Sequence, residues 1–421
     1  MRVSISKSDL SGNVTAPSSK SYTIRGLMCA ALARGESIIM NPLGSDDTGA
    51  ALSVLGQLGI RTKQEENFWR VRGGSFHRSD GDLFCAESAT TLRFMTAIAA
   101  LVPGQHCLTA GPSLSARPVL PLIEALKRLG VTCSCRGEVP PVIIRGGSLR
   151  GGETELPGDI SSQFLSALLL AAPFSEKGMT IRLTSPLRSA PYVMMTLDCM
   201  QWFGISVAFA DTLDAFEVAR QAYKPTTFRV EGDWSSASYL VALGALAGEV
   251  EVENLTGESL QGDRVILDFL QEMGASVTTG NNSITVRKSG LRAITADLSN
   301  CIDLLPTMAV LAAAAEGISR FTGIERARIK ESNRVAAMRE GLERMGIVFI
   351  EETDRISITG GSPHAAIINS KDDHRIAMAF GLLGTVAGDT IIEGAECVSK
   401  TYPQFWKDLA ALGGKVTIDG K

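Results

Sequence analysis

The sequence predicts an α/β protein built from six copies of one unit of about 70 residues. Helix-like apolar runs that end at a glycine recur in two interleaved series. The first series is amphipathic and spaced by 67 to 74 residues, ending at Gly59, Gly130, Gly204, Gly274, Gly346 and Gly413. The second is more apolar and spaced by 69 to 74 residues, ending at Gly35, Gly104, Gly178, Gly248, Gly317 and Gly388. Two series that share one period indicate a repeated structural unit.

Each unit is expected to contain one buried helix and one amphipathic helix. Glycine is expected to end each amphipathic helix, because it adopts the left-handed conformation at little cost. Alternating segments such as 37–43 and 180–187 follow the buried helices and predict strands. The unit is therefore interpreted as α/β, with sheets that cover the helices.

Counting units divides the chain into two lobes of three units each. The N-terminal lobe is expected to span 18–231, and the C-terminal lobe 1–17 together with 232–421. Segment 220–236 is polar, contains a proline and reads as a crossover, and the first residues read as a strand of the C-terminal lobe. A chain that crosses twice predicts a hinge, so the active site is expected in the cleft between the lobes.

The composition argues against several classes of function. A net charge of −4 gives no general attraction to nucleic acid or to an anionic membrane. The eight cysteines are scattered without a CxxC pair, and only four histidines are present, which argues against a structural zinc site. Scattered cysteines in a long chain predict reduced thiols in the cytoplasm. Neither an apolar signal core nor a membrane span is expected.

Polar residues precede all six buried helices, and they are the informative part of the repeat. Ser, Thr and Asp at such positions are typical N-caps, whereas several helix N-termini together would bind anions. Capping is the favoured interpretation at 232–238, but the added Lys20 and Arg375 favour anion binding at 17–21 and 371–375. The six segments are 17–21, 86–93, 158–163, 232–238, 300–306 and 371–375.

A basic cluster occurs at 326–334, "RARIKESNR". If this segment is helical, Arg326, Lys330 and Arg334 lie on one face, where like charges repel. A solvated face and a face that binds phosphate or carboxylate both stay open at this point. Arg117 and Lys400 lie in short polar loops, where a solvent-exposed side chain is the usual explanation.

Ten motifs, in order and at family-like spacing, resemble the 5-enolpyruvylshikimate-3-phosphate synthase family of enolpyruvyl transferases. The resemblance covers nearly the whole chain. The motifs are "PSSKSYTIRG", "AESATTLRF", "ARP", "SSQFLSALLLAAP", "SAPY", "QGDR", "IDLLPTMAV", "IKESNR", "DDHRIAMAF" and "KTYPQF". The resemblance implies a fold of two lobes, each of three βαβαββ units. The helices of each lobe would lie inside the strands, an arrangement called an inside-out α/β barrel.

The resemblance also implies the reaction. The carboxyvinyl group of phosphoenolpyruvate is transferred to the 5-hydroxyl of shikimate 3-phosphate, in the shikimate pathway to chorismate and aromatic amino acids. The expected partners are these two substrates, with no nucleic acid, no membrane, no metal and no cofactor, and a monomer is expected.

Site residues are carried over from the family position by position. The implied catalytic residues are Asp303, Glu331 and Lys20. The implied shikimate 3-phosphate ligands are Lys20, Ser21, Arg25, Ser161, Ser162, Gln163, Ser189, Asp303 and Lys330. The implied phosphoenolpyruvate ligands are Lys20, Ala89, Arg117, Gln163, Arg334, Arg375 and Lys400.

The sequence departs from the family pattern before the second buried helix. The family commonly has "NAGT" or "NSGT" where this chain has Glu87-Ser-Ala89-Thr90. The Ala89 methyl resembles that of glyphosate-tolerant members, so weak glyphosate binding is expected. The negative charge of Glu87 beside an anion site is unexpected, and a pairing with a nearby arginine stays open. Further along, Arg326 replaces a common Asn, and Asn333 replaces an Asp.

Alternative interpretations accompany several of these residues. Asp303 could be a helix N-cap, Glu331 a surface partner of Arg334 or Arg328, and His374 a structural neighbour of Arg375. The rival UDP-N-acetylglucosamine enolpyruvyl transferase typically has a Lys-Asn pair and a loop cysteine. This chain has Lys20-Ser21 and no cysteine in the loop of Arg117. The acidic balance argues against an RNA-processing relative and against a ring-shaped clamp.

Overall fold

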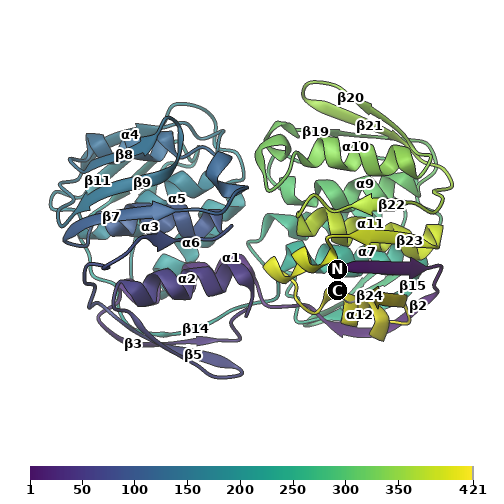
Figure 1. Ribbon diagram of the computed structural model, residues 1–421, viewed down its shortest axis with the longest axis horizontal. Coiled ribbons are helices and arrows are strands. Elements are labelled where there is room, and N and C mark those ends of the chain that lie inside the picture. Colours follow the sequence, from purple (N-terminus) through teal and green to yellow (C-terminus); the bar gives the residue numbers. More distant parts are fainter. Residues whose placement is uncertain (420–421) are drawn as a thin grey trace. The chain divides into compact units, whose positions relative to one another are not determined.

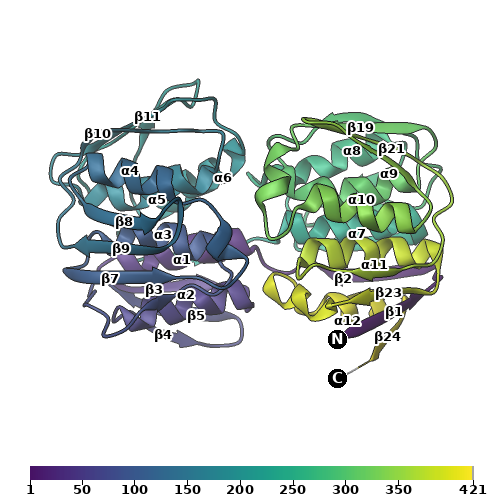
Figure 2. The ribbon, with the colours of Figure 1, turned by 45° about the horizontal axis from the view of Figure 1, so that its top comes forward.

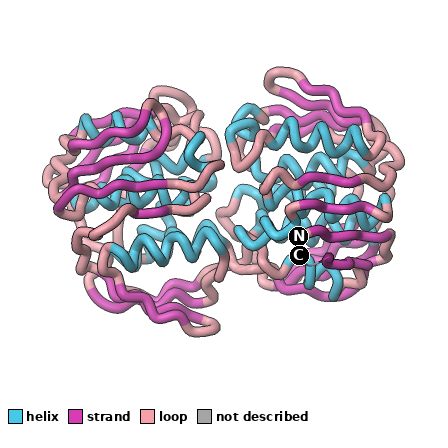
Figure 3. The backbone as a smooth tube through the Cα atoms, in the orientation of Figure 1, coloured by secondary structure: helices cyan, strands magenta, loops and turns pink. Residues whose placement is uncertain are grey.

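The computed structural model describes residues 1–419 and divides into two compact units. The N-terminal lobe is Ser18–Val230, and the C-terminal lobe is Met1–Pro17 together with the chain from Glu231 onward. Figures 1 and 2 show the first in purple to teal, and most of the second in green to yellow. Within each lobe, helices lie inside and strands outside (Figure 3). Residues 1–419 form six four-stranded sheets, which confirms the predicted fold class of six α/β repeats.

The second repeat shows the complete unit. It runs β6 (Leu83–Phe84), α3 (Ala89–Ala99), β7 (Gly104–Thr109), α4 (Leu120–Arg128), β8 (Thr132–Arg136) and β9 (Val139–Gly146). β6 pairs parallel with β7, while β9 pairs antiparallel with both β7 and β8. The third and fifth repeats use the same order, with strands β10 (Gly152–Leu156), β11 (Met179–Leu183), β12 (Ala208–Phe209), β13 (Ala215–Val218), β18 (Thr295–Asp297), β19 (Ile318–Thr322), β20 (Val348–Glu351) and β21 (Arg355–Thr359).

The other three sheets each take one strand from a distant part of the chain. In the first repeat β14 (Thr227–Arg229) pairs with β3 (Gly35–Met40). In the fourth, β2 (Leu10–Thr15) pairs with β15 (Gly248–Glu253). In the sixth, β1 (Arg2–Ser6) lies between β23 and β24. Their remaining strands are β4 (Arg61–Gln64), β5 (Phe68–Gly73), β16 (Ser276–Thr279), β17 (Ser283–Arg287), β22 (Ile367–Asn369), β23 (Thr390–Glu393) and β24 (Lys415–Asp419).

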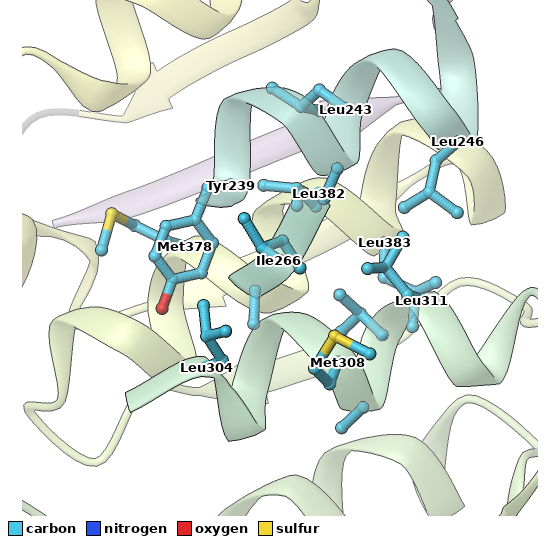
Figure 4. Close-up of a cluster of buried hydrophobic side chains, with 14 of the residues drawn as sticks. Tyr239, Leu243, Leu246, Ile266, Leu304, Met308, Leu311, Met378, Leu382 and Leu383 are labelled. Carbon is cyan, nitrogen blue, oxygen red and sulfur yellow. The ribbon is translucent and has the colours of Figure 1, made fainter. Parts of the chain in front are cut away.

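The apolar helical series forms the helices at the centre of each lobe. They are α1 (Lys20–Leu32), α3, α5 (Ser162–Ala171), α7 (Trp234–Ala247), α9 (Leu305–Ala313) and α11 (His374–Ala387). Every residue of α7 is buried. In the C-terminal lobe, Tyr239 and Leu243 of α7, Met308 of α9 and Leu382 of α11 belong to one hydrophobic cluster (Figure 4). A packed set of helices fixes the positions of the helix N-termini.

The amphipathic series forms α2 (Asp46–Gln57), α4, α6 (Ala190–Trp202), α8 (Ile266–Glu272), α10 (Arg334–Arg344) and α12 (Phe405–Ala411). The glycine that follows each of them has a φ between +79° and +96°. At five of the six, the space that a Cβ would need borders a basic side chain, namely His77, Arg150, Lys224, Arg292 or His364. Glycine therefore avoids strain there and leaves room for the neighbouring side chain at the C-terminus of the helix.

Candidate functional site

Lys20 begins helix α1 of the N-terminal lobe. Ser19 caps this helix, because its Oγ accepts the backbone N–H of Tyr22 at 3.4 Å. The Lys20 ammonium lies 3.0 Å from Oδ2 of the buried Asp47, in the first turn of α2. The segment thus combines a helix cap, as one sequence interpretation of 17–21 expects, with a largely buried cation paired to Asp47. Anion binding by this segment stays a prediction.

Arg25 lies one turn further along α1 and is 1% exposed. Its guanidinium donates to Thr196 Oγ1 at 2.8 Å, to the carbonyl of Tyr192 at 2.9 Å and to the carbonyl of Ser21 at 3.1 Å. Burial lowers its pKa from the usual arginine value. Arg25 therefore fixes the backbone of Ser21 against α6.

Arg93 was missed as a site residue, although it lies inside the quoted motif 86–94. Its Nη1 donates to Ser161 Oγ at 3.0 Å and to Gln163 Oε1 at 2.7 Å, and its Nη2 donates to the carbonyl of Pro118 at 3.0 Å. Its position four residues after Ala89 could have signalled it, since that spacing places it on the same helix face. Arg93 brings three motifs of the N-terminal lobe together.

The remaining expected ligands of the N-terminal lobe also lie at helix ends. Ser161 is the N-cap of α5, and Ser162 is that helix's first residue. Ser189 precedes α6 in the left-handed conformation, at φ 55°. Arg117 follows the short 3-10 helix η1 (Leu114–Ala116) and is buried. Ala89 is the first residue of α3 and is also buried.

Arg334 organises the carboxylates of the C-terminal lobe and is 1% exposed. Its Nη1 donates to Asp303 Oδ1 at 2.7 Å, and its Nη2 donates to Glu331 Oε2 at 2.7 Å. Two further bonds, at 2.8 and 3.2 Å, reach both oxygens of Asp373. Burial alone would lower the Arg334 pKa, but the three carboxylates outweigh it and raise that pKa.

Asp303 lies in the 3-10 helix η4 (Ile302–Leu304) that precedes α9, and the N-cap residues of these two helices are Cys301 and Leu304. Besides Arg334, Lys330 Nζ lies 3.1 Å from Oδ1 and Arg375 Nη2 lies 3.7 Å from Oδ2. Burial would raise the pKa of Asp303, but the charges of Lys330, Arg375 and Arg334 outweigh it and hold that pKa well below its usual value. The carboxylate is therefore ionised at neutral pH.

Glu331 and Lys330 follow the short helix η5 (Glu325–Ile329). Glu331 Oε1 lies 3.6 Å from Lys400 Nζ, in addition to the bond from Arg334. The alternative pairing of Glu331 with Arg334 is thus present, but not as an exposed surface pair. Burial lowers the pKa of Lys330 to about 8, so this ammonium titrates close to neutral pH.

The condition of one continuous helix over 326–334 is not met. The 3-10 helix ends at Ile329, Lys330 is extended, and α10 begins only at Arg334. Asn333 is the N-cap of α10, because its Oδ1 accepts the N–H of Ala336 at 3.1 Å, and a helix therefore begins after it instead of continuing from η5. Arg326 donates to the carbonyl of Ser299 at 2.5 Å. Lys330 and Arg334 still meet, through Asp303.

Asp373 was also missed as a site residue, because the favoured anion-binding interpretation of 371–375 rests on Arg375. It is the N-cap of α11, accepting the N–H of Arg375 at 3.0 Å, and it also accepts from Ser332 Oγ at 3.0 Å. His374 follows it and is buried. A cap whose second oxygen binds Arg334 cannot be distinguished from an ordinary cap by sequence alone.

No set of three or more His, Cys, Asp or Glu side chains in residues 1–419 is grouped as metal ligands would be. In the same residues, no helix has the length and hydropathy needed to cross a bilayer.

Comparisons with known proteins show which family the chain resembles. A profile of EPSP synthase (3-phosphoshikimate 1-carboxyvinyltransferase) matches residues 5–409. The chain is 49% identical over 421 residues to a 3-phosphoshikimate 1-carboxyvinyltransferase of Dehalococcoides mccartyi, covering 100% of both chains. It is 44% identical to the enzyme of that name from Methanosarcina mazei, covering 99% of both.

Solved structures agree with the fold. EPSP synthase from Acinetobacter baumannii superposes with a TM-score of 0.84 at 26% identity, covering 99% of this chain and 100% of that one. The enolpyruvyl transferase NikO from Streptomyces tendae superposes with a TM-score of 0.80 at 19% identity, covering 99% of this chain and 98% of that one. The second likeness shows a shared fold alone.

Proposed function

The chain belongs to the EPSP synthase (3-phosphoshikimate 1-carboxyvinyltransferase) family, and we propose how its residues perform that family's reaction. The reaction transfers the enolpyruvyl group of phosphoenolpyruvate to the 5-hydroxyl of shikimate 3-phosphate, giving 5-enolpyruvylshikimate 3-phosphate and phosphate. The observation that carries the assignment is the full-length match to relatives of that name at 49% identity.

Shikimate 3-phosphate needs ligands for its phosphate, its carboxylate and its hydroxyls. We assign the phosphate to Ser161, Ser162, Ser189 and Lys330, and the carboxylate to Ser21 and Arg25. The hydrogen bond from Arg93 Nη1 to Ser161 Oγ supports this assignment, because it fixes the position of that hydroxyl. Helix N-termini add partial positive charge at Ser21 and Ser162.

Phosphoenolpyruvate carries a phosphate and a carboxylate and needs several cations. We assign it to Lys20, Arg117, Gln163, Arg334, Arg375 and Lys400, beside the methyl of Ala89. Local clusters of cations explain how a chain of net charge −4 would bind two polyanions. Gln163 is held by Arg93 and by Thr90, which leaves it in one fixed orientation.

We propose that Asp303 accepts the proton of the 5-hydroxyl as its oxygen attacks C2 of phosphoenolpyruvate. Glu331, in its protonated form once both substrates are bound, delivers its proton to C3, which completes a tetrahedral intermediate. Glu331 then takes a proton back from C3 while the C2–O bond to phosphate breaks, so the vinyl group is restored and phosphate leaves with the proton that Asp303 had accepted. Lys20 stabilises negative charge on both substrates. Asp303 suits its role because its cationic neighbours keep it ionised.

The assigned residues come from both lobes, and we propose that the two sets bind the same two substrates. Bound anions would relieve the repulsion among the cations. We further propose a monomer that acts in the cytoplasm without nucleic-acid or membrane partners. Within residues 1–419 each sheet consists of the chain's own strands, which supports the proposed monomer. All eight cysteines in these residues are free thiols, which supports the proposed cytoplasmic location.

Phosphate release from phosphoenolpyruvate tests the choice of acceptor. Shikimate 3-phosphate should support release, whereas UDP-N-acetylglucosamine should not. Release with the UDP-sugar alone would point to the rival transferase, and release with neither would refute enolpyruvyl transfer. Light scattering should give a mass close to 44.7 kDa for the monomer.

A further inference from the structure

Glu87 binds the backbone of the loop that carries Arg117. Its Oε2 accepts the N–H of Leu114 at 2.8 Å, and its Oε1 accepts the N–H of Ser113 at 3.2 Å. Leu114 is the first residue of η1, so these are N–H groups that the short helix leaves without an internal partner. One carboxylate therefore satisfies two adjacent backbone donors through charge-assisted hydrogen bonds.

The same loop is attached at further points to the start of α3. The N–H of Gly111 donates to the carbonyl of Ala86 at 2.8 Å, and Arg93 Nη2 donates to the carbonyl of Pro118 at 3.0 Å. The N–H of Arg117 donates to the carbonyl of Leu114 at 3.0 Å, inside this frame. The backbone of Arg117 is thus fixed from both sides by residues just before and within α3.

The backbone around Glu87 is adapted to this contact. Ala86 has a φ of +48°, a conformation that costs a non-glycine residue about 1 kcal/mol. A Cβ at Gly111 would lie 2.3 Å from Glu87 Oε1, so a side chain at position 111 would displace the carboxylate. The strained backbone of Ala86 and the need for glycine at position 111 both indicate that the fold holds the Glu87 carboxylate in one place.

We propose that Glu87 is a positioning residue, which sets Arg117 for phosphoenolpyruvate by holding the N-terminus of η1. This inference rests on the proposed function, because Arg117 is assigned there to phosphoenolpyruvate. It also accounts for a negative charge beside an anion site, since the carboxylate is occupied by the loop's N–H groups. Glutamine has one acceptor oxygen and would turn its amide NH₂ toward a second donor.

The direct test compares Glu87→Gln and Glu87→Ala with the unaltered protein in steady-state kinetics. The KM for phosphoenolpyruvate should rise by about tenfold in Glu87→Ala, because both charge-assisted hydrogen bonds are lost. It should rise by less in Glu87→Gln, because one acceptor oxygen remains. The KM for shikimate 3-phosphate should change by less than about twofold, because its assigned ligand Ser161 is held by Arg93, which stays in place when Glu87 is replaced. Glu124→Gln, at an exposed glutamate of α4, is the matched control and should change neither constant.

A double-mutant cycle with Arg117→Ala separates positioning from general damage. If Glu87 acts through Arg117, Glu87→Ala should have little further effect on the KM for phosphoenolpyruvate once Arg117 is absent. Full additivity would overturn the proposal, as would an unchanged KM for phosphoenolpyruvate in Glu87→Ala. An equal rise in both KM values with a lowered melting temperature would also overturn it. Failure of the proposed function is distinguishable, since the unaltered protein would then show no turnover.

Discussion

Arg334 and Asp303 are joined by a 2.7 Å hydrogen bond between Nη1 and Oδ1, in a part of the C-terminal lobe where Arg334 is 1% exposed. The same guanidinium also binds Glu331 and Asp373. One cation thus orients the proposed base, the proposed proton donor and the cap of α11. Removing it would leave three carboxylates, one of them the fully buried Asp373, short of a counter-charge.

Arg334→Met should therefore lower both stability and activity. Losing one partner of a buried ionic network costs about 3–5 kcal/mol, and kcat/KM should fall by about a thousandfold. Thermal unfolding and steady-state kinetics measure the two effects. The control is Arg339→Met, on an exposed arginine of the same helix that pairs with Glu351. A variant of Arg334 with unchanged stability would contradict the network.

The binding of shikimate 3-phosphate should weaken at alkaline pH. The pKa of Lys330 lies near 8, lowered chiefly by burial, so its positive charge is present below that pH and is lost as the pH rises through it. The KM for shikimate 3-phosphate should then increase by up to about tenfold per pH unit above pH 8. In Lys330→Arg the increase should disappear, because arginine stays charged. Lys371→Arg, at an exposed lysine, should leave the alkaline increase in place.

Asp263 should reduce the stability of the fold at neutral pH. It is buried, and its Oδ1 has no hydrogen-bond partner among the described residues. Burial, followed by the charge of Asp303, raises its pKa from 3.8 to about 6, so its favourable contribution is complete below pH 4 and is lost as the pH rises through 6. Asp263→Asn should therefore stabilise the protein at pH 7, by up to about 3 kcal/mol.

Thermal unfolding of Asp263→Asn at pH 7 and at pH 4 tests this sign. The gain in melting temperature should be present at pH 7 and largely absent at pH 4. An equal gain at both values, or a loss at pH 7, would show that ionisation of Asp263 does not limit stability. Asp268→Asn, on the neighbouring helix α8, provides the control.

Glyphosate binding should depend on the methyl of Ala89. This residue is buried at the start of α3, and Ala89→Gly removes one carbon beside the proposed phosphoenolpyruvate ligands. The glyphosate inhibition constant should fall by about tenfold or more, with a smaller change in the KM for phosphoenolpyruvate. Ala99→Gly, at the last residue of the same helix, controls for the helix-propensity cost. Low-micromolar inhibition of the unaltered protein would refute the expected tolerance.

The six repeats could be predicted from the sequence because the pattern that marks them depends only on neighbouring residues. Each amphipathic helix ends where the backbone turns left-handed, and only glycine adopts that conformation cheaply, so Gly59 and Gly130 mark the period. Strand exchange is harder to predict, because β14 is three residues long and completes a sheet nearly two hundred positions earlier in the chain. Periodicity within a strand does not specify such a distant partner.

The polar cluster was only partly predictable for a related reason. Motifs indicated Asp303 and Arg334, but not that Asp373 binds Arg334, because a capping aspartate has the same sequence pattern whatever its second oxygen contacts. Arg93 was missed because a long side chain at a buried helix position can reach three segments. Such convergence depends on tertiary packing and not on local sequence.

The most direct test measures phosphate and 5-enolpyruvylshikimate 3-phosphate together, with phosphoenolpyruvate present and shikimate 3-phosphate either added or omitted. Enolpyruvyl transfer predicts that phosphate release depends on shikimate 3-phosphate and that each phosphate is matched by one molecule of product. Phosphate release at the same rate without shikimate 3-phosphate, or release without the enolpyruvyl product, would contradict it.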